Sequence, residues 1–140
     1  MNNSLMLCVD ASVIVRHVTS ESVMDLWESW MQAEAKIIAP TLLYYEVTNG
    51  LYRYQKAGIL PSQAVEKALA AALALPIELV SNLDLHHRAR DVAVEYDLPA
   101  TYDAHYLALA KWIDVELWTS DMRLVSTLKP HKLKWVKGIE

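Results

Sequence analysis

The stretch Leu5-Met6-Leu7-Cys8-Val9-Asp10 is a continuous run of apolar residues that ends on a carboxylate. A short apolar run without alternating polar residues is typical of a strand buried on both faces, as in a parallel sheet. Functional side chains of open parallel sheets gather just beyond the carboxyl ends of the strands. The stretch therefore predicts a buried parallel strand, and it places Asp10 at the edge of the sheet where a site would form.

Short apolar segments recur along the chain and alternate with stretches of helical periodicity. Strands are expected at residues 5–9, 36–39, 77–80, 115–119 and 133–136. Apolar residues at three- and four-residue steps predict helices opening at Ser20 and at residues 41–58, 61–75, 81–96 and 102–112, with a short helix after Asp121. This alternation indicates an α/β fold: a single domain of residues 1–140, with a parallel sheet of about five short strands between helical layers.

Length and composition bear on the compartment. A chain of 140 residues can form one domain whose core needs no disulfide or structural metal. Cys8 is the single cysteine and lies within an apolar run, as expected for a buried thiol in a reducing cytoplasm. The longest apolar run, residues 68–77, is shorter than the about 20 residues that span a bilayer, and no basic residue precedes the first apolar segment. We therefore expect a cytoplasmic protein with no membrane span, and one whose 54% hydrophobic content favours self-association or a protein partner.

The formal net charge of −4 argues against nucleic-acid binding by general electrostatic attraction, because proteins that use it are usually basic. Two bound divalent cations would carry four positive charges and bring −4 to 0. An acidic site loaded with metal ions would thus be compatible with an anionic substrate.

Four of the acids differ from the rest in their surroundings. Asp10 directly follows the first predicted strand, and Asp121 follows the strand at residues 115–119 after one more residue. Glu46 lies in a predicted helix on the border of its apolar stripe. Asp103 lies in the first turn of another helix, and the residues four and seven positions later are apolar, so it should point inward. Acids on apolar faces are unusual, since unpaired acids are almost never fully buried.

Each of these acids also has a purely structural interpretation. Asp10 and Asp121 are placed to cap the amino ends of helices, and Asp103 would interact favourably with a helix macrodipole. Glu46 has a candidate ion-pair partner in Arg53. For any one acid alone the structural interpretation is preferred, but four such acids in this order along the chain favour a shared site.

The segments that carry these acids resemble the four signature motifs of PIN domains, most of all those of VapC-type toxins from prokaryotic toxin–antitoxin pairs. The most specific motif is Tyr102-Asp103-Ala104-His105-Tyr106-Leu107-Ala108-Leu109-Ala110, together with Thr119-Ser120-Asp121 downstream. The resemblance extends over residues 5–136. The other segments that take part are Cys8-Val9-Asp10-Ala11-Ser12 and Tyr45-Glu46-Val47-Thr48-Asn49-Gly50-Leu51.

The resemblance implies a metal-dependent endoribonuclease that leaves 5′-phosphate and 3′-hydroxyl ends. The family's acids map onto Asp10, Glu46, Asp103 and Asp121, so these residues are the candidate catalytic groups and the candidate ligands of Mg²⁺ or Mn²⁺. Hard cations prefer oxygen ligands, and two of them can neutralise a phosphodiester and activate water. We expect Asp10, Asp103 and Asp121 to bind the principal ion, with Glu46 completing the site or holding a second one. The resemblance also implies an RNA substrate, a homodimer, and a cognate antitoxin that inserts a segment into the cleft.

Further polar residues lie close to the proposed ligands. Ser12, Asn49 and Thr119 are each within three residues of one and are candidate hydrogen-bond partners, although local backbone bonding is an equally good interpretation. Arg123 is the candidate phosphate contact, with a surface role as the alternative. The basic tail at residues 129–137 would suit an RNA backbone, but its alternation is better explained by an edge strand with a charged outer face.

Two functional alternatives remain open. A catalytically silent PIN-like module would bind RNA or protein without cleavage, although such a module would be expected to lose one of the acids. A metal-free ribonuclease would use two of the five histidines. We expect His105 to line the cleft without ligating anything, and His86 and His87 to be solvated. Trp27 and Trp30 lie one helical turn apart and are expected in the core or in a dimer interface.

Overall fold

The opening apolar run forms the central strand of the sheet. The computed structural model describes residues 5–140. In it, β1 (Met6–Val9) lies between β2 (Lys36–Pro40) and β4 (Glu116–Thr119), and all strand pairs are parallel. The complete order is β3-β2-β1-β4-β5, with β3 (Ile77–Val80) and β5 (Val136–Gly138) at the two edges. Because every strand runs the same way, their carboxyl ends meet at one edge of the sheet.

The helices connect these strands and complete a single α/β domain, as the sequence predicts. Among the described residues, none of the helices combines the length and the apolar character that crossing a membrane requires. The helical elements are α1 (Ala11–Thr19), α2 (Met24–Gln32), α3 (Leu43–Lys56), α4 (Ser62–Leu73), α5 (Asp84–Glu95), α6 (Tyr102–Ile113), α7 (Met122–Leu128) and a 3-10 turn (Lys129–His131).

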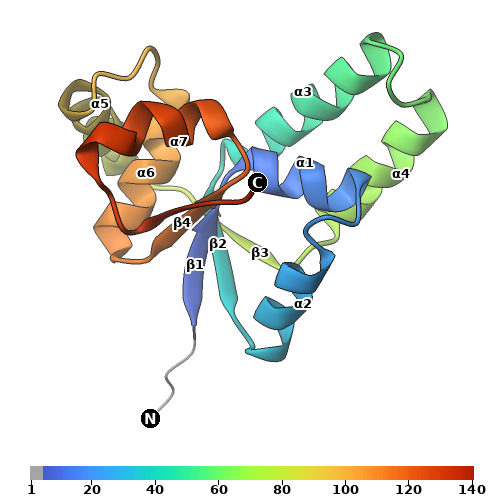
Figure 1. Cartoon of the computed structure of the whole chain (residues 1–140), viewed down its shortest axis with the longest axis horizontal. Coiled ribbons are helices and arrows are strands. Elements are labelled where there is room, and N and C mark those ends of the chain that lie inside the picture. Colours follow the sequence, from blue (N-terminus) through green and yellow to red (C-terminus); the bar gives the residue numbers. More distant parts are fainter. Residues whose placement is uncertain (1–4) are drawn as a thin grey trace.

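The helices cover the sheet from two sides. Helix α6 packs against β1, β2 and β4, and α5 packs on α6. Helix α1 packs against β4 and contacts α3 and α4, which pair with each other. Figure 1 shows α5, α6 and α7 grouped to the left of the strands and α1, α3 and α4 to the right, with the C-terminus close to α1. The carboxyl ends of the strands thus open between the two groups of helices.

Helix α1 is absent from the sequence-based prediction, which starts the first helix at Ser20. Its sequence is rich in β-branched residues, which lower helix propensity. The helix forms because its tertiary setting overrides that preference: Asp10 caps its amino end, and Val13 and Ile14 are fully buried. The helix predicted at Ser20 begins instead at Met24.

Two smaller predictions also differ from the structure. The last strand starts at Val136, not at residue 133, because the chain first leaves the 3-10 turn through Lys132 in a left-handed conformation. The helix expected from residue 81 begins instead at Asp84, whose amide donates a hydrogen bond to the side chain of Asn82 at 2.9 Å.

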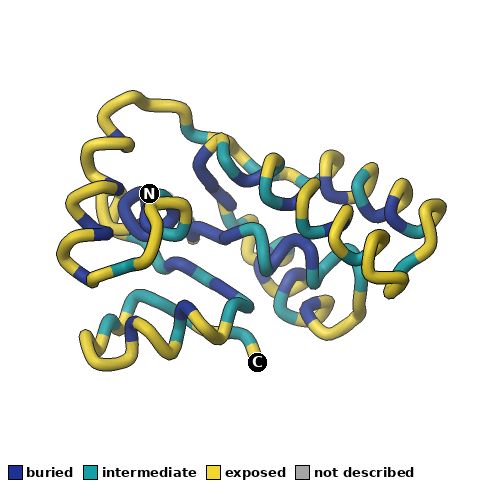
Figure 2. Tube along the Cα trace, turned by 90° about the horizontal axis from the view of Figure 1, so that it is seen from above, coloured by how far each residue is buried: buried dark blue, intermediate teal, exposed yellow. Residues whose placement is uncertain are grey.

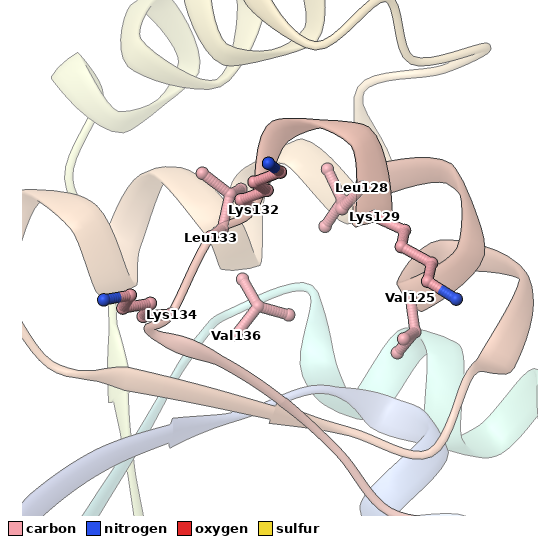
Figure 3. Close-up of a pocket in the computed structure, with 7 residues that line it drawn as sticks. All are labelled: Val125, Leu128, Lys129, Lys132, Leu133, Lys134 and Val136. Atoms are coloured by element: carbon pink, nitrogen blue, oxygen red, sulfur yellow. The ribbon is translucent and has the colours of Figure 1, made fainter.

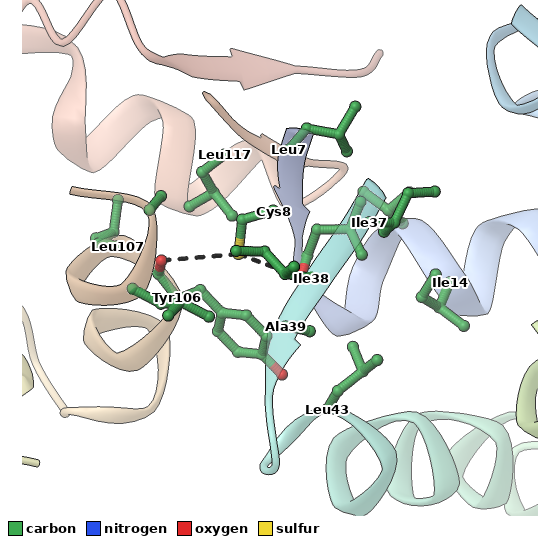
Figure 4. Close-up of a cluster of buried hydrophobic side chains, with 14 of the residues drawn as sticks. Leu7, Cys8, Ile14, Ile37, Ile38, Ala39, Leu43, Tyr106, Leu107 and Leu117 are labelled. Carbon is green, nitrogen blue, oxygen red and sulfur yellow. Dashed lines mark hydrogen bonds between the residues drawn. The ribbon is translucent and has the colours of Figure 1, made fainter. Parts of the chain in front are cut away.

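The hydrophobic core surrounds β1 and β2 and extends onto the inner faces of the helices (Figure 2). Burial raises the pKa of the Cys8 thiol, so the cysteine behaves as an unreactive core residue. Trp27 and Trp30 are both buried and meet edge to face, which supports the core interpretation of this pair. Figure 4 shows Cys8 at the centre of the core, with α6 on one side and β2 on the other.

Candidate active site

Asp10 and Asp121 follow neighbouring strands and cap neighbouring helices. Val9 pairs with Trp118 in the sheet, so β1 and β4 end at the same level. Asp10 Oδ1 accepts the amide hydrogens of Ser12 and Val13 at 3.0 and 3.3 Å. In the same way, Asp121 Oδ1 accepts those of Arg123 and Leu124, at 3.0 and 3.4 Å, so both aspartates are helix caps.

Two hydroxyl groups fix Asp10 and connect it to the end of β4. Ser12 Oγ donates to Asp10 Oδ1 at 2.5 Å and accepts the Ser120 amide at 2.8 Å. The Thr119 hydroxyl donates to Asp10 Oδ2 and accepts the amide of Asp121 at 3.0 Å. Ser12 and Thr119 thus each donate a hydrogen bond to Asp10, which is only 5% exposed.

Glu46 and Asp103 come from helices on opposite sides of the strand ends. The hydroxyl of Tyr106, which lies one turn after Asp103 on α6, donates to Glu46 Oε1 on α3 at 2.6 Å. Tyr106 is fully buried, and burial followed by the neighbouring Glu46 raises the pKa of its phenol. Figure 4 shows its ring passing Ala39 of β2 on the way from α6. No local sequence pattern predicts this contact, although a buried tyrosine usually needs a partner for its hydroxyl.

All four predicted acids line one cleft of about 970 Å³ at the carboxyl edge of the sheet. Ser12 and Asn49 also line it, whereas Thr119 is fully buried beneath. Arg16 and Arg53 contribute positive charge to the cleft and were not singled out from the sequence as substrate contacts. Arg16 is held by hydrogen bonds to Ser120 Oγ at 2.7 Å and to two C-terminal backbone carbonyls.

Arg123, the predicted phosphate contact, is exposed on α7 and does not take part in lining this cleft among the described residues. The structural alternative of a Glu46–Arg53 ion pair is not observed either. Within residues 5–140, the bond from Tyr106 is the only side-chain hydrogen bond to Glu46, and no salt bridge joins Glu46 to Arg53. The guanidinium of Arg53 is thus available to a ligand in the cleft.

The cleft is electrostatically strained. Burial raises the pKa of Asp10 to about 6, against the opposing effect of the hydrogen bonds from Ser12, Thr119 and Val13, and Asp103 raises it further. The pKa of Asp103 is also raised to about 6, first by burial and then by the negative charges of Asp121 and Glu46. The acids therefore interact electrostatically, and their combined negative potential favours the binding of a cation.

The donor set of the cleft suits a hard divalent cation, because it consists of carboxylates without thiolate or imidazole groups. Within residues 5–140, the side chains of His, Cys, Asp and Glu nowhere form a group of three or more that is arranged to hold a metal ion. The chemistry of the four acids thus fits Mg²⁺ or Mn²⁺, while their side chains are not drawn together into a finished coordination shell.

The histidines lie elsewhere. None of the five, all of which are described, lines the acid cleft. His86 is exposed, as expected, but its Nδ1 lies 2.9 Å from Nε2 of His105, and both residues line a second pocket. His17 stacks on Trp27. This arrangement gives no support to a ribonuclease mechanism based on histidine alone.

The basic tail is also separate from the acids. It borders a pocket of about 430 Å³ that shares no residue with the cleft. Figure 3 shows apolar side chains facing the space between α7 and β5, with the lysine ammonium groups around its margin. The edge strand β5 covers only Val136–Gly138, whereas residues 129–135 form a 3-10 turn and a loop, so the edge-strand interpretation is wrong for most of the tail. The pocket is lined by Val125, Leu128, Lys129, Lys132, Leu133, Lys134 and Val136.

Comparisons with known proteins agree with the α/β fold. The model of the PIN domain family matches residues 7–127. The crystal structure of PAE2754 from Pyrobaculum aerophilum superposes with a TM-score of 0.69 over 98% of this chain and 91% of that chain, at 22% sequence identity. At this identity the likeness shows a shared fold. No curated protein matches the sequence significantly.

Proposed function

The chain belongs to the PIN domain family, whose members are generally nucleases, and on that premise we propose that it is a metal-dependent endoribonuclease. One observation carries the proposal: four acids from four separate segments of the chain line a single cleft at the carboxyl edge of the sheet. A fold has no structural need for such a group, because the carboxylates repel one another, Asp10 is buried and the other three acids are half-buried.

Mg²⁺ or Mn²⁺ would be held by Asp10, Asp103 and Asp121, with Glu46 completing the site. When bound, a divalent cation supplies positive charge to the phosphodiester and makes water a better nucleophile. The protein supplies orientation. Hydrogen bonds hold both oxygens of Asp10, and Tyr106 holds Glu46, so both carboxylates are oriented before a cation binds.

The remaining groups of the cleft suit the binding of RNA. Arg53 lies two helical turns after Glu46 on α3, a distance of about 10 Å along the helix axis. Its guanidinium would bind a phosphate away from the one being cleaved. Arg16 is anchored by its own hydrogen bonds and adds a second, more rigid positive charge.

The motifs of the VapC type support a finer assignment, in which the protein is the toxin of a toxin–antitoxin pair. It would then act on RNA in the cytoplasm as a homodimer and be held inactive by a cognate antitoxin protein. The antitoxin would bind in the acidic cleft, where a basic side chain inserted between the acids would take the place of the cation.

The test is a cleavage assay on a labelled pool of structured RNA, with Mg²⁺ or Mn²⁺ and again with EDTA. Wild-type protein should give products with 5′-phosphate ends, and both EDTA and the substitution Asp10→Asn should abolish them. The matched control is Asp97→Asn, because Asp97 is exposed in a left-handed turn that asparagine tolerates. Cleavage that persists in EDTA would overturn the metal mechanism.

A second candidate is the catalytically silent PIN-like module. It is favoured by one observation, namely that the four acids are not closed into a coordination shell among the described residues. Binding of RNA without cleavage, unchanged by Mn²⁺ and by Asp10→Asn, would identify this function.

A further inference from the structure

A second pocket, of about 270 Å³, adjoins the acid cleft. Leu42, Tyr45 and Tyr102 line both cavities, so the two pockets share a wall. The pocket lies where the chain leaves β2 and β3 and where α6 begins. Two of the shared residues directly precede candidate catalytic acids, since Tyr45 is followed by Glu46 and Tyr102 by Asp103. We call this cavity the tyrosine pocket.

The shared tyrosines are far more exposed than large aromatic side chains usually are. Tyr45 is 78% and Tyr102 61% exposed, and Leu83 on the opposite wall is 85% exposed. Within residues 5–140, neither of these tyrosine hydroxyls makes a hydrogen bond to another protein group. Their ring faces and hydroxyls are therefore open to a ligand, which suits stacking on a planar group.

The histidine pair supplies polar recognition in the same pocket. His105 Nδ1 lies 2.6 Å from the carbonyl of Thr101, so it carries the hydrogen of that bond. With both rings neutral, His105 Nε2 is then an acceptor and receives its hydrogen bond from His86 Nδ1, at 2.9 Å. This leaves Nε2 of His86 as a hydrogen-bond acceptor on a residue that lines the pocket.

The charge of the pocket separates it from the acid cleft. Its lining consists of apolar, hydroxyl, amide and imidazole side chains, and no Asp, Glu, Lys or Arg is among its described residues. A phosphate or a charged side chain would find no counter-ion there. A planar, neutral group with hydrogen-bonding edges fits this combination of tyrosine faces and imidazole nitrogen.

We propose that the tyrosine pocket binds an unstacked nucleobase of the RNA whose backbone lies in the acid cleft. This inference rests on the proposed ribonuclease function and extends it to substrate selection. Proteins read single-stranded RNA by stacking splayed bases on aromatic side chains and by hydrogen bonds to the base edges. Tyr45 or Tyr102 provides the stacking surface, and His86 reads the edge. Because the pocket shares Tyr45 and Tyr102 with the cleft, and these residues directly precede Glu46 and Asp103, this base belongs to a nucleotide next to the phosphodiester that is cleaved.

The test uses amide NMR spectra of the whole chain. It is titrated separately with each of the four 5′-ribonucleoside monophosphates and with ribose 5-phosphate, which lacks a base. The nucleotides should shift the amides of residues 81–86, with different affinities for different bases, and ribose 5-phosphate should leave those amides in place. Tyr102→Leu should weaken base-dependent binding roughly 5- to 100-fold, as expected for the loss of one stacked base, whereas Tyr102→Phe should retain it.

The matched control is Tyr52→Leu, because Tyr52 is an exposed tyrosine on α3 outside both cavities. Two results would overturn the proposal: no nucleotide shifts residues 81–86, or ribose 5-phosphate shifts them equally. Shifts caused by N-acetyl-leucine amide and not by nucleotides would assign the pocket to a protein segment instead. Mn²⁺ added to the same sample broadens the amides beside Asp10 and Asp103 if the metal site is real, so a failure of the metal mechanism is read separately.

Discussion

Replacing Asp10 by asparagine should stabilise the fold at neutral pH and at the same time abolish cleavage. The buried carboxylate is ionised at pH 7 although its pKa is about 6, compared with an ordinary value of 3.8. At about 1.4 kcal/mol for each pKa unit, the ionised Asp10 carboxylate destabilises the folded state by roughly 3 kcal/mol. Burial is its main cause, and the negative charge of Asp103 adds to it.

Asparagine removes the charge and keeps most of the cap. Its side-chain oxygen can still accept the amides of Ser12 and Val13, and asparagine caps helices about as well as aspartate. The hydrogen bond that Asp10 Oδ2 accepts from Thr119 is lost, which costs about 1 kcal/mol. The variant should therefore gain about 2 kcal/mol in free energy of unfolding at pH 7.5.

The gain should depend on pH in a defined direction. The folded state binds the Asp10 proton more tightly than the unfolded state, so wild-type stability falls as the pH rises from about 4 to about 6. Below this window Asp10 is protonated in both states, and the advantage of the variant should disappear. Above it the advantage should be complete and constant.

Urea unfolding at pH 4 and at pH 7.5 measures both effects, with Asp97→Asn as the control whose stability should change little. Mn²⁺ adds a second readout. At 100 times its dissociation constant a ligand stabilises the folded state by about 2.7 kcal/mol, and this increment should appear in the wild type and be lost in Asp10→Asn. If the variant is less stable than the wild type at pH 7.5 by as much as at pH 4, Asp10 is an ordinary cap and the argument from electrostatic strain is wrong.

Three further predictions concern a residue that positions Glu46, a basic residue of the cleft and a residue of the core. Tyr106→Phe should lower kcat/KM about 10- to 100-fold with little change in melting temperature, because only the hydroxyl that positions Glu46 is removed. An unchanged kcat/KM would show that Tyr106 has no role in the site. Arg53→Ala, introduced into Asp10→Asn protein, should weaken RNA binding measured by fluorescence anisotropy and reduce the slope of log affinity against log salt by about 1. The control Arg90→Ala, at an exposed position outside the cleft, should change neither the affinity nor the slope. Leu109→Ala should lower the free energy of unfolding by about 2–5 kcal/mol in urea, and a loss below about 1 kcal/mol would contradict its complete burial.

Most of the fold was predictable because its signals are local. The strand runs are short and apolar, and the helices from α3 onward carry clear periodicity. All of these helices except α6 end near a glycine or a proline. Helix α1 was not predictable in this way, because Val13, Ile14, Val15 and Val18 favour extended structure when they are considered alone. The burial of this segment against α3, α4 and β4, together with the cap from Asp10, makes it helical.

In the candidate site, too, the local features could be predicted from the sequence and the long-range contacts could not. The positions of the four acids followed from strand ends and helix faces, which sequence spacing encodes. The bond between Tyr106 and Glu46 joins residues that are 60 positions apart, and no local pattern marks it. The presence of Arg16 and Arg53 in the cleft, and the distance of Arg123 from it, likewise depend on how the helices pack around the strand ends.

The capping and the functional interpretations of the aspartates are compatible, for a different reason at each residue. In Asp121, Oδ1 accepts both capping amides, and Oδ2 makes no hydrogen bond among the described residues, so one oxygen is available to the cleft. In Asp10, both oxygens are engaged, and the cap therefore orients a carboxylate that burial would otherwise drive to its neutral form. The amides at the start of α1 stabilise negative charge where the cleft needs it. A helix cap at the end of a parallel strand is thus a means of keeping a strained carboxylate ionised and in place.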